Sequence, residues 1–161
     1  MKKEKLLDQA GQIEKYLKSQ ERTERQAEPE LGAVHQAFRQ LADCFDSKNG
    51  GFGSAPKFPA PHNLIFLMEY GAREKRPEAL AMAEKTLVQM YRGGIFDHIG
   101  GGFSRYSTDG QWLVPHFEKM LYDNSLLVMA YIKAYGSTGR KMYGCVAERI
   151  LEYVRRELTD S

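Results

Sequence analysis

The sequence is poor in the residues that mark many specialised protein classes. It has two cysteines, one tryptophan and four histidines among 161 residues, and its formal net charge is only +2. Cys44 and Cys145 lie far apart in the chain, so they form neither a C-x-x-C redox motif nor a zinc knuckle. We expect both thiols to be buried on apolar helix faces in a reducing compartment.

Neither charge nor hydrophobicity is concentrated enough for a nucleic acid or a membrane. A nucleic-acid-binding domain should have a basic patch, whereas acids and bases are nearly balanced here. The longest apolar run, residues 126–132, is far shorter than a membrane-spanning helix. The N-terminal segment is charged throughout, which excludes a signal peptide. We therefore expect a cytoplasmic protein with no nucleic-acid or membrane partner.

Apolar residues recur at helical spacing along most of the chain. Leu31, Val34, Phe38, Leu41 and Phe45 are three or four residues apart, which places them on one helix stripe. No stretch alternates as an obvious β-strand does, so we expect an all-α fold of about six helices. We predict helices over residues 5–18, 31–45, 62–70, 77–91, 118–135 and 142–154.

The first 30 residues differ in composition from the rest. We predict a charged helix and a charged connector over residues 1–30, and a helical-hairpin domain over residues 31–161. The connector itself is the polar segment of residues 19–30.

Two glycine-rich segments share an order of residues. In DSKNGGFGSAPKFP, residues 46–59, a Gly-Gly-Phe unit precedes Pro-Lys-Phe-Pro and an apolar helix. In residues 100–118, GGGFSRY precedes Pro-His-Phe-Glu and another apolar helix. A spacing of about fifty to sixty residues indicates repeated supersecondary units. Each unit is predicted to be a helical hairpin with an elaborated Gly-Gly-Phe loop.

The same two segments resemble a known family. GGFGSAPKFPAPHNL and GGIFDHIGGGFSRYSTDGQWLVPHFEKMLYDNS closely resemble the YyaL-type, spermatogenesis-associated thioredoxin-like family, and the resemblance covers about Leu31 to the C-terminus. Members of that family have a thioredoxin-like domain followed by a helical domain. The helical domain is similar to the six-hairpin (α/α)6 toroids of glycosidases and N-acylglucosamine 2-epimerases. The resemblance implies that this chain forms roughly half of such a toroid.

Two departures from the family pattern affect what we expect of this chain. The thioredoxin-like part is absent, and the chain stops at Ser161, where family members continue into a third Gly-Gly-Phe loop. We therefore expect a truncated paralogue, a split gene product or an excised fragment. Half a toroid leaves apolar helix flanks uncovered, which predicts a homo-oligomer or a compact bundle with rearranged packing.

The resemblance implies that loops at one end of the toroid form a ligand-binding funnel. Arg105 can hold an anionic group or an open-chain sugar oxygen there, or it can pair with Asp97 or Asp109. Lys57 can play either part at the first loop. Four rings can stack on a sugar or fill the core instead: Phe52, Phe103, Tyr106 and Trp112.

Candidate acids and bases gather between the second glycine run and the helix after it. His98 beside Asp97 can act as an oriented general base, or Asp97 can brace the glycine loop by accepting backbone N–H bonds. His116 and Glu118 are placed at the start of the predicted helix, where a glutamate also suits the helix dipole. The four histidines and their acidic neighbours match no known metal site, so we predict neither metal nor cofactor.

Carbohydrate chemistry assigns these groups two alternative roles. Glycosidases hold two carboxylates about 5 to 9.5 Å apart, and such a pair is available among Asp97, Glu118 and Asp123. An epimerase would instead use two proton-transfer groups on opposite faces of a sugar carbon, for which His98 and His116 are suited.

Three functions are compatible with these features. The first is a carbohydrate-active domain, a hydrolase or an epimerase, with a sugar or sugar-phosphate ligand. The second is a non-catalytic binding or interaction module, and the third is a structural fragment that self-associates. Because a toroid site draws on loops from several hairpins, we expect this chain alone to be inactive.

Overall fold

The computed structural model describes residues 2–21 and 31–160, which fall into two compact units. The first unit, Met1–His35, contains α1 (Lys2–Glu21) and the start of α2 (Leu31–Asp43). In α1 the apolar side chains of Leu6, Ile13 and Leu17 are exposed. The connector predicted over residues 19–30 lies mostly outside the described residues.

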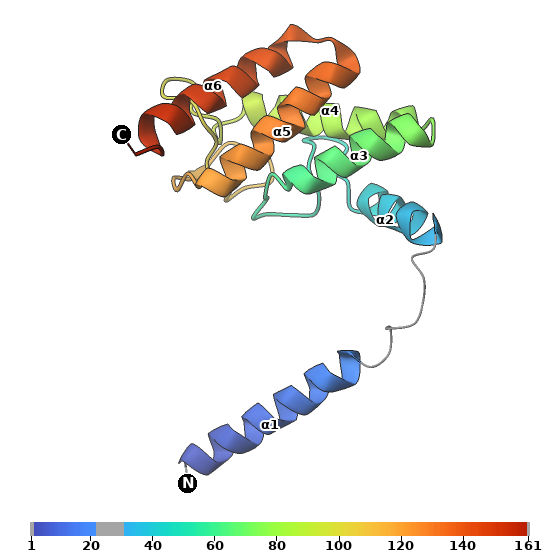
Figure 1. The fold of residues 1–161 in the computed structure, drawn as a ribbon, viewed down its shortest axis with the longest axis vertical. Coiled ribbons are helices and arrows are strands. Elements are labelled where there is room, and N and C mark those ends of the chain that lie inside the picture. The colour runs from blue at the N-terminus through green and yellow to red at the C-terminus, as the bar shows by residue number, and fades with distance from the viewer. Residues whose placement is uncertain (1, 22–30, 161) are drawn as a thin grey trace. The chain divides into compact units, whose positions relative to one another are not determined.

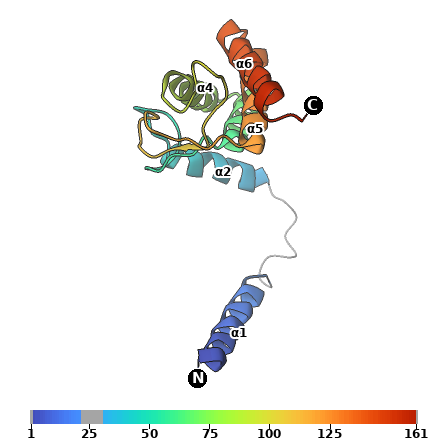
Figure 2. The same cartoon turned by 90° about the vertical axis from the view of Figure 1, so that its left-hand side faces the viewer.

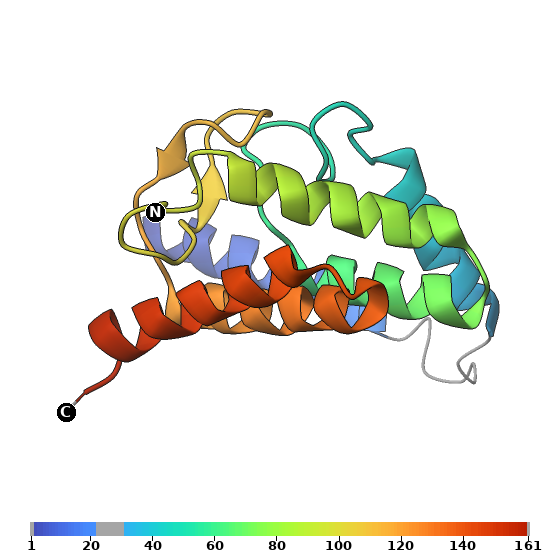
Figure 3. The same cartoon turned by 90° about the horizontal axis from the view of Figure 1, so that it is seen from above.

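The second unit, Gln36–Ser161, contains two helical hairpins (Figure 1). α3 packs against α4, α5 packs against α6, and α3 also contacts α5. The two tight turns lie at one end of the hairpins, and the long loop from α4 to α5 lies at the other (Figure 3). Figure 2 shows the hairpins nearly end-on. The four helices are α3 (Pro61–Arg73), α4 (Pro77–Arg92), α5 (Leu121–Thr138) and α6 (Lys141–Glu157).

The prediction of an all-α fold is confirmed. Across residues 2–21 and 31–160 there are six helices and one small antiparallel sheet, formed by β1 (Tyr106–Ser107) and β2 (Pro115–His116). Strands of two residues are too short to show the alternation by which a sequence indicates a strand. None of the helices in these residues is both long enough and apolar enough to cross a bilayer.

The core of the second unit lies between the two hairpins. In α4 the apolar residues recur at helical spacing and therefore face the core: Ala79, Ala83, Leu87 and Met90 are all buried. Tyr131 of α5 is fully buried, and its hydroxyl donates a hydrogen bond of 2.8 Å to the Leu87 carbonyl. Its polar atom is therefore satisfied inside the core.

One helix start and the burial of the cysteines were predicted wrongly. α5 begins at Leu121 rather than Glu118, because the Glu118 carbonyl accepts a hydrogen bond from the Arg105 N–H (2.8 Å) in an extended segment before the helix. Cys44 and Cys145 are both exposed. Cys44 lies just beyond the end of α2, and Cys145 lies on the outer side of α6, so neither faces the core.

The two Gly-Gly-Phe loops have the same fold. We call residues 44–53 loop A and residues 95–104 loop B. In loop A the Asp46 N–H donates to the Gly51 carbonyl (2.9 Å) and the Gly50 N–H donates to the Asp46 carbonyl (2.8 Å). In loop B, Asp97 makes the corresponding bonds with Gly102 (3.0 Å) and Gly101 (2.9 Å). The predicted repeat is therefore confirmed.

Each loop also closes with a pair of phenylalanines and rests on a helix. Phe45 bridges to Phe52 in loop A, and Phe96 bridges to Phe103 in loop B. Loop A rests on α4, where the Thr86 hydroxyl accepts a hydrogen bond of 2.8 Å from the Gly51 N–H. Loop B rests on α6, where the Arg149 guanidinium donates to the His98 carbonyl (2.6 Å).

Gly51 is required both by its backbone conformation and by its neighbours. Its φ is +83°, and a Cβ placed there would overlap the Trp112 ring. Gly102 in loop B has a φ of +78°, and its Cβ would lie 2.5 Å from Tyr153 Cδ1. Gly53 has a φ of +74° but open space around the Cβ position.

Replacing Gly51 by alanine should therefore destabilise the second unit more than replacing Gly53. The Gly53→Ala change should cost about 1–2 kcal/mol, the cost of a left-handed backbone for an L-residue. The Gly51→Ala change adds a steric overlap in the core, so we expect a loss of about 3 kcal/mol or more. Urea unfolding followed by circular dichroism measures both, and equal losses would contradict the packing shown for Gly51.

Candidate functional site

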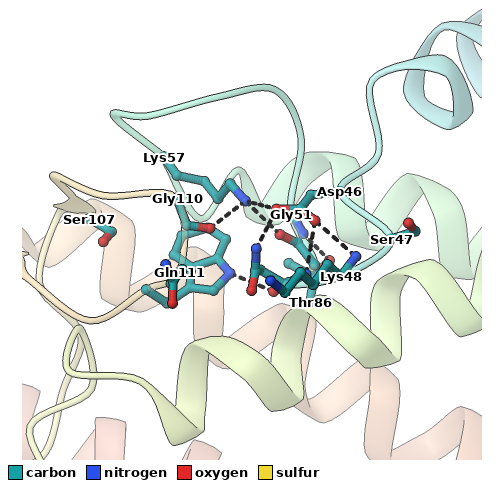
Figure 4. A network of polar contacts seen from close by, with 12 residues as sticks. Asp46, Ser47, Lys48, Gly51, Lys57, Thr86, Ser107, Gly110 and Gln111 are labelled. Carbon is teal, nitrogen blue, oxygen red and sulfur yellow. Dashed lines mark hydrogen bonds and ion pairs between the residues drawn. The ribbon is translucent and has the colours of Figure 1, made fainter.

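Lys57 is a buried cation at the centre of the loop region (Figure 4). Its ammonium donates to Asp46 Oδ2 at 2.7 Å, to the Gly50 carbonyl at 3.0 Å and to the Gly110 carbonyl at 2.8 Å. Its side chain is 1% exposed. An ammonium has three N–H donors, and all three are used inside the protein. Lys57 therefore has no donor left for a ligand.

Asp46 is the ionised partner of Lys57. Burial by itself would raise the pKa of Asp46, but the Lys57 ammonium and the backbone N–H groups of Asn49 and Lys48 hold this pKa well below its ordinary value. The carboxylate therefore serves both as a counter-ion and as the brace of loop A.

Lys119 and Asp97 repeat this arrangement in loop B. The Lys119 ammonium donates to Asp97 Oδ2 and to the Gly101 carbonyl, both at 2.8 Å. Asp97 Oδ1 accepts the N–H groups of Ile99 (2.9 Å) and Gly100 (2.8 Å). The Lys119 hydrogen bond, helped by these N–H groups, holds the pKa of Asp97 well below its ordinary value. Asp97 therefore braces the glycine loop.

His98 is an exposed residue of loop B. Its ring is exposed and packs against Tyr91, with a centroid distance of 5.3 Å, and against Phe96, at 5.1 Å. Asp97 accepts bonds from Lys119 and from its own loop, and no Asp97–His98 side-chain bond is present in the described residues.

Two of the candidate stacking rings belong to the interior, and a third is half-buried. Trp112 is fully buried, and its indole N–H donates to the Asn49 carbonyl at 2.9 Å. Phe103 is also fully buried and stacks on Tyr131 with centroids 5.7 Å apart. Phe52 is half-buried against Phe45. Trp112 and Phe103 therefore present no free face to a ligand, and Phe52 supports loop A through its contact with Phe45.

Four titratable side chains gather where α5 begins. We call Arg105, His116, Glu118 and Asp123 the α5 N-terminal cluster. The Arg105 guanidinium lies 3.2 Å from Glu118 Oε2, and His116 Nδ1 lies 3.8 Å from the same oxygen. Arg105, His116 and Glu118 are each roughly half exposed, so solvent and ligands can reach them.

The small sheet brings the members of this cluster together. β1 and β2 pair Tyr106 opposite His116, and the Arg105 N–H donates to the Glu118 carbonyl just beyond the sheet. Tyr106 and His116, which are separated in sequence, thus become cross-strand neighbours.

Three rings form a platform beside the cluster. Tyr106 and His116 stack with centroids 4.7 Å apart and an interplanar angle of 17°. Phe58 also packs against Tyr106, with centroids 4.8 Å apart. We call Phe58, Tyr106 and His116 the aromatic platform. Phe58 is half exposed, so its ring is accessible as well.

Asp123 differs from Glu118 in its environment. It is in the first turn of α5, and its Oδ2 is buried with no hydrogen-bond partner among the described residues. Burial raises the pKa of Asp123; the Arg105 charge lowers it, the Glu118 charge raises it further, and the net direction is upward. The α5 N-terminal cluster therefore contains two carboxyls in different surroundings: Asp123 has a buried oxygen without a partner, and Glu118 pairs with Arg105.

The structure brings together five of the predicted site residues and separates six others from them. The five form the cluster and platform: Arg105, Tyr106, His116, Glu118 and Asp123. The six brace the loops, fill the core or lie outside the cluster: Phe52, Lys57, Asp97, His98, Phe103 and Trp112. No group of three His, Cys, Asp or Glu side chains in the described part of the chain is placed to hold a metal ion.

Sequence reasoning missed three residues that build this region. Phe58 extends the platform, and Lys119 pairs with Asp97. Asn124 is fully buried; its side chain accepts the Phe103 N–H (2.7 Å) and donates to the Phe103 carbonyl (3.0 Å). The signal available for Lys119 was the repeat itself, because each glycine segment is followed by a lysine within an aromatic stretch.

Solved structures with the same arrangement of helices define the fold class. Cellobiose 2-epimerase from Bacillus thermoamylovorans B4167 superposes with a TM-score of 0.62 at 16% identity, covering 77% of this chain and 37% of that chain. Cellobiose 2-epimerase from Spirochaeta thermophila DSM 6192 gives a TM-score of 0.61 at 19% identity, covering 78% of this chain and 36% of that one. The chain is therefore part of a six-hairpin (α/α)6 toroid.

Sequence comparison identifies the family. The sequence matches no family model. It is 47% identical over 141 residues to human spermatogenesis-associated protein 20, and 48% identical over 126 residues to the mouse protein. The chain is thus a homologue of one segment of spermatogenesis-associated protein 20, and the resemblance found in the two glycine-rich segments is confirmed. The segment aligned with the human protein covers 84% of this chain but only 18% of the human protein.

Replacing Lys57 by methionine should strongly destabilise the second unit. The change removes the cation and leaves the Asp46 carboxylate and two carbonyls without their donor, for which we expect a loss of about 3–5 kcal/mol. Lys48→Met, at an exposed position of the same loop, is the matched control and should change stability by less than about 0.5 kcal/mol. Denaturant unfolding measures both, and similar values for the two variants would show that the Lys57 network is dispensable.

The lowered pKa values of Asp46 and Asp97 predict acid sensitivity. Because both carboxyls bind protons more readily in the unfolded chain, their stabilisation is complete above about pH 4 and is lost progressively as the pH falls below it. Asp46→Asn and Asp97→Asn should each lower stability at pH 7 and flatten the acid slope. Unfolding curves between pH 7 and pH 3 test this, and variants with the slope of the parent chain would refute it.

Proposed function

We propose that the α5 N-terminal cluster and the aromatic platform form one wall of a carbohydrate-binding site. The observation that carries the proposal is the combination found there. An accessible set of rings stands next to an arginine, a histidine and two carboxyls, one paired with the arginine and one with a buried oxygen. Rings bind the apolar faces of a sugar, and charged groups bind its hydroxyls.

The charges of the cluster favour a neutral sugar over a sugar phosphate. Glu118 neutralises Arg105, and Asp123 adds a second carboxyl to the same cluster. No excess positive charge remains to attract a phosphate. A neutral hexose or disaccharide suits both the rings and the balanced charge.

The position of the cluster at the long-loop end of the hairpins agrees with this proposal. The structures of similar fold are described as cellobiose 2-epimerases and as a sugar epimerase from a ruminal bacterium, which supports a sugar as the ligand class. In the complete toroid, His116 and Asp123 are suited to exchange protons with the sugar, in epimerisation or in hydrolysis. For this chain we propose binding as the function.

Titration with neutral sugars tests the proposal. Nuclear magnetic resonance of the ¹⁵N-labelled chain should show shifts at Arg105, Tyr106 and His116 on adding glucose, mannose or cellobiose, and weaker shifts with glucose 6-phosphate. Tyr106→Ala should weaken binding about tenfold through the loss of ring stacking, and Glu118→Gln should weaken it as well.

Glu78→Gln provides the matched control for Glu118→Gln. Glu78 also pairs with an arginine, Arg76, at 3.4 Å and at similar exposure. This variant should bind sugars as the parent chain does. No shift at the cluster with any sugar, equal losses in both glutamate variants, or preferential binding of the phosphate would each overturn the proposal.

A further inference from the structure

Asn49 and Gly50 form the one Asn-Gly sequence in the chain, and they lie in loop A. An asparagine followed by glycine loses its side-chain amide more readily than other asparagines, because glycine has no side chain to hinder attack by its backbone nitrogen. Loop B has Gly100 at the corresponding position, so the fold of the loop does not require an asparagine there. Loop A therefore carries a reactive group that loop B lacks.

In this reaction the backbone of Gly50 attacks the side chain of Asn49. A base in water removes the proton of the Gly50 nitrogen, which then forms a bond to the Asn49 side-chain carbonyl carbon. The bond from that carbon to the amide nitrogen breaks, and the nitrogen takes up a proton and leaves as ammonia. The five-membered succinimide ring that remains is opened by water at either carbonyl, which gives aspartate or isoaspartate. No oxidant or reductant is needed.

The folded loop withholds both reacting groups. The Gly50 N–H donates to the Asp46 carbonyl at 2.8 Å, and Gly50 is buried against α4, where an added Cβ would lie 2.9 Å from Thr86 Cα. The Asn49 side-chain amide donates to Asp46 Oδ2 at 3.0 Å. Lys57 bonds to the same carboxylate oxygen and to the Gly50 carbonyl. Cyclisation therefore requires these bonds to break first.

Asp109 and Gly110, the one Asp-Gly sequence in the chain, contact the same lysine but differ in chemistry. The Asp109 carboxylate accepts three backbone N–H groups between residues 111 and 114. Burial alone would raise the pKa of Asp109, but these N–H groups hold it below its ordinary value. An ionised carboxylate has no neutral leaving group, so it resists cyclisation. Of the two sequences that Lys57 contacts, Asn49–Gly50 is the reactive one.

The products of the reaction do not fit the closed loop. Aspartate places a carboxylate oxygen where Asn49 Nδ2 lies 3.0 Å from Asp46 Oδ2, so two like charges face each other. Lys57 has no further N–H donor with which to neutralise the second charge. Isoaspartate instead adds one carbon to the backbone before Gly50, which displaces the Gly50 N–H from the Asp46 carbonyl. Either product therefore favours an open loop A.

We propose that Asn49 is a site of spontaneous deamidation that reacts only when loop A opens, and that the reaction makes this opening irreversible. The rate of deamidation then follows the fraction of molecules in which the loop is open. The inference is independent of the proposed carbohydrate site, because no residue of the α5 N-terminal cluster or the aromatic platform takes part.

Mass spectrometry of the folded chain, incubated at neutral pH and then digested, measures the reaction. A synthetic peptide of residues 46–53 provides the unfolded reference. The folded chain should lose the Asn49 amide at least about 100-fold more slowly than the peptide, because opening the loop breaks several hydrogen bonds. Equal rates in the chain and the peptide, or reaction at Asp109 ahead of Asn49, would overturn the inference.

Thr86→Val tests whether opening of loop A limits the rate. The Thr86 hydroxyl accepts the Gly51 N–H at 2.8 Å and donates to the Met82 carbonyl at 2.9 Å. Its loss leaves a buried N–H of loop A without an acceptor, so deamidation of Asn49 should become about tenfold faster. Circular dichroism establishes that the variant is folded.

Thr138→Val is the matched control. The Thr138 hydroxyl also accepts a backbone N–H, that of Arg140 at 3.3 Å, and donates to the carbonyl four residues earlier, that of Ala134 at 2.7 Å. It lies at the end of α5 and makes no bond to loop A. This variant should deamidate at the parent rate. No acceleration in Thr86→Val, or the same acceleration in both variants, would contradict control of the rate by loop A.

Amide hydrogen exchange tests whether the product keeps the loop open. Asn49→Asp reproduces one product and should raise the exchange rates of the Gly50 and Gly51 amides about tenfold at neutral pH, through repulsion from Asp46. Asn49→Ser keeps a short neutral donor at this position and cannot form the succinimide, so its amides should exchange as those of the parent chain do. The same exchange rates in both variants would show that the product fits the closed loop and would overturn the inference.

Discussion

The second unit depends on a buried ammonium. Lys57 connects its own segment to two others. Its ammonium bonds to the Asp46 carboxylate and the Gly50 carbonyl of loop A, and to the Gly110 carbonyl in the segment before Trp112. Its backbone also pairs with Ser107, by N–H···O bonds of 2.8 and 2.9 Å in the two directions. β1, which carries Tyr106 of the aromatic platform, is thereby fixed to the segment that leads into α3.

Lys119 shows that the same lysine anchor occurs in both repeats. Lys119 bonds to the Asp97 carboxylate and the Gly101 carbonyl of loop B as Lys57 bonds to loop A, and each ammonium also lies near an aromatic ring, Trp112 in one case and Tyr153 in the other. In each loop an aspartate satisfies the backbone N–H groups, glycines adopt the conformations that a side chain would forbid, and a lysine fixes the distance to the next segment. Charge pairing of this kind specifies geometry more than it adds stability.

The sequence was sufficient for the helices and the repeat but insufficient for the contacts between distant segments. Helical periodicity is local, so it placed the hairpins correctly. The start of α5 was misjudged because the Arg105 N–H holds the segment at Glu118 extended, through a hydrogen bond just beyond the small sheet. The two roles considered for Asp97 could not be separated without knowing that Lys119 reaches it. Trp112 follows the polar segment of residues 109–111 yet is buried, and the sequence could not show this because its hydrogen-bond partner Asn49 is 63 positions away.

The burial of the single tryptophan has a practical consequence for optical spectroscopy. Trp112 is wedged between the two loops, with its indole N–H held by loop A and the Lys57 ammonium 5.4 Å from its ring. Its emission therefore reports on the seam where the first repeat meets the second. Separation of that seam would expose the indole to water and shift its fluorescence to longer wavelength. The protein thus has a built-in reporter for the docking of one repeat against the next.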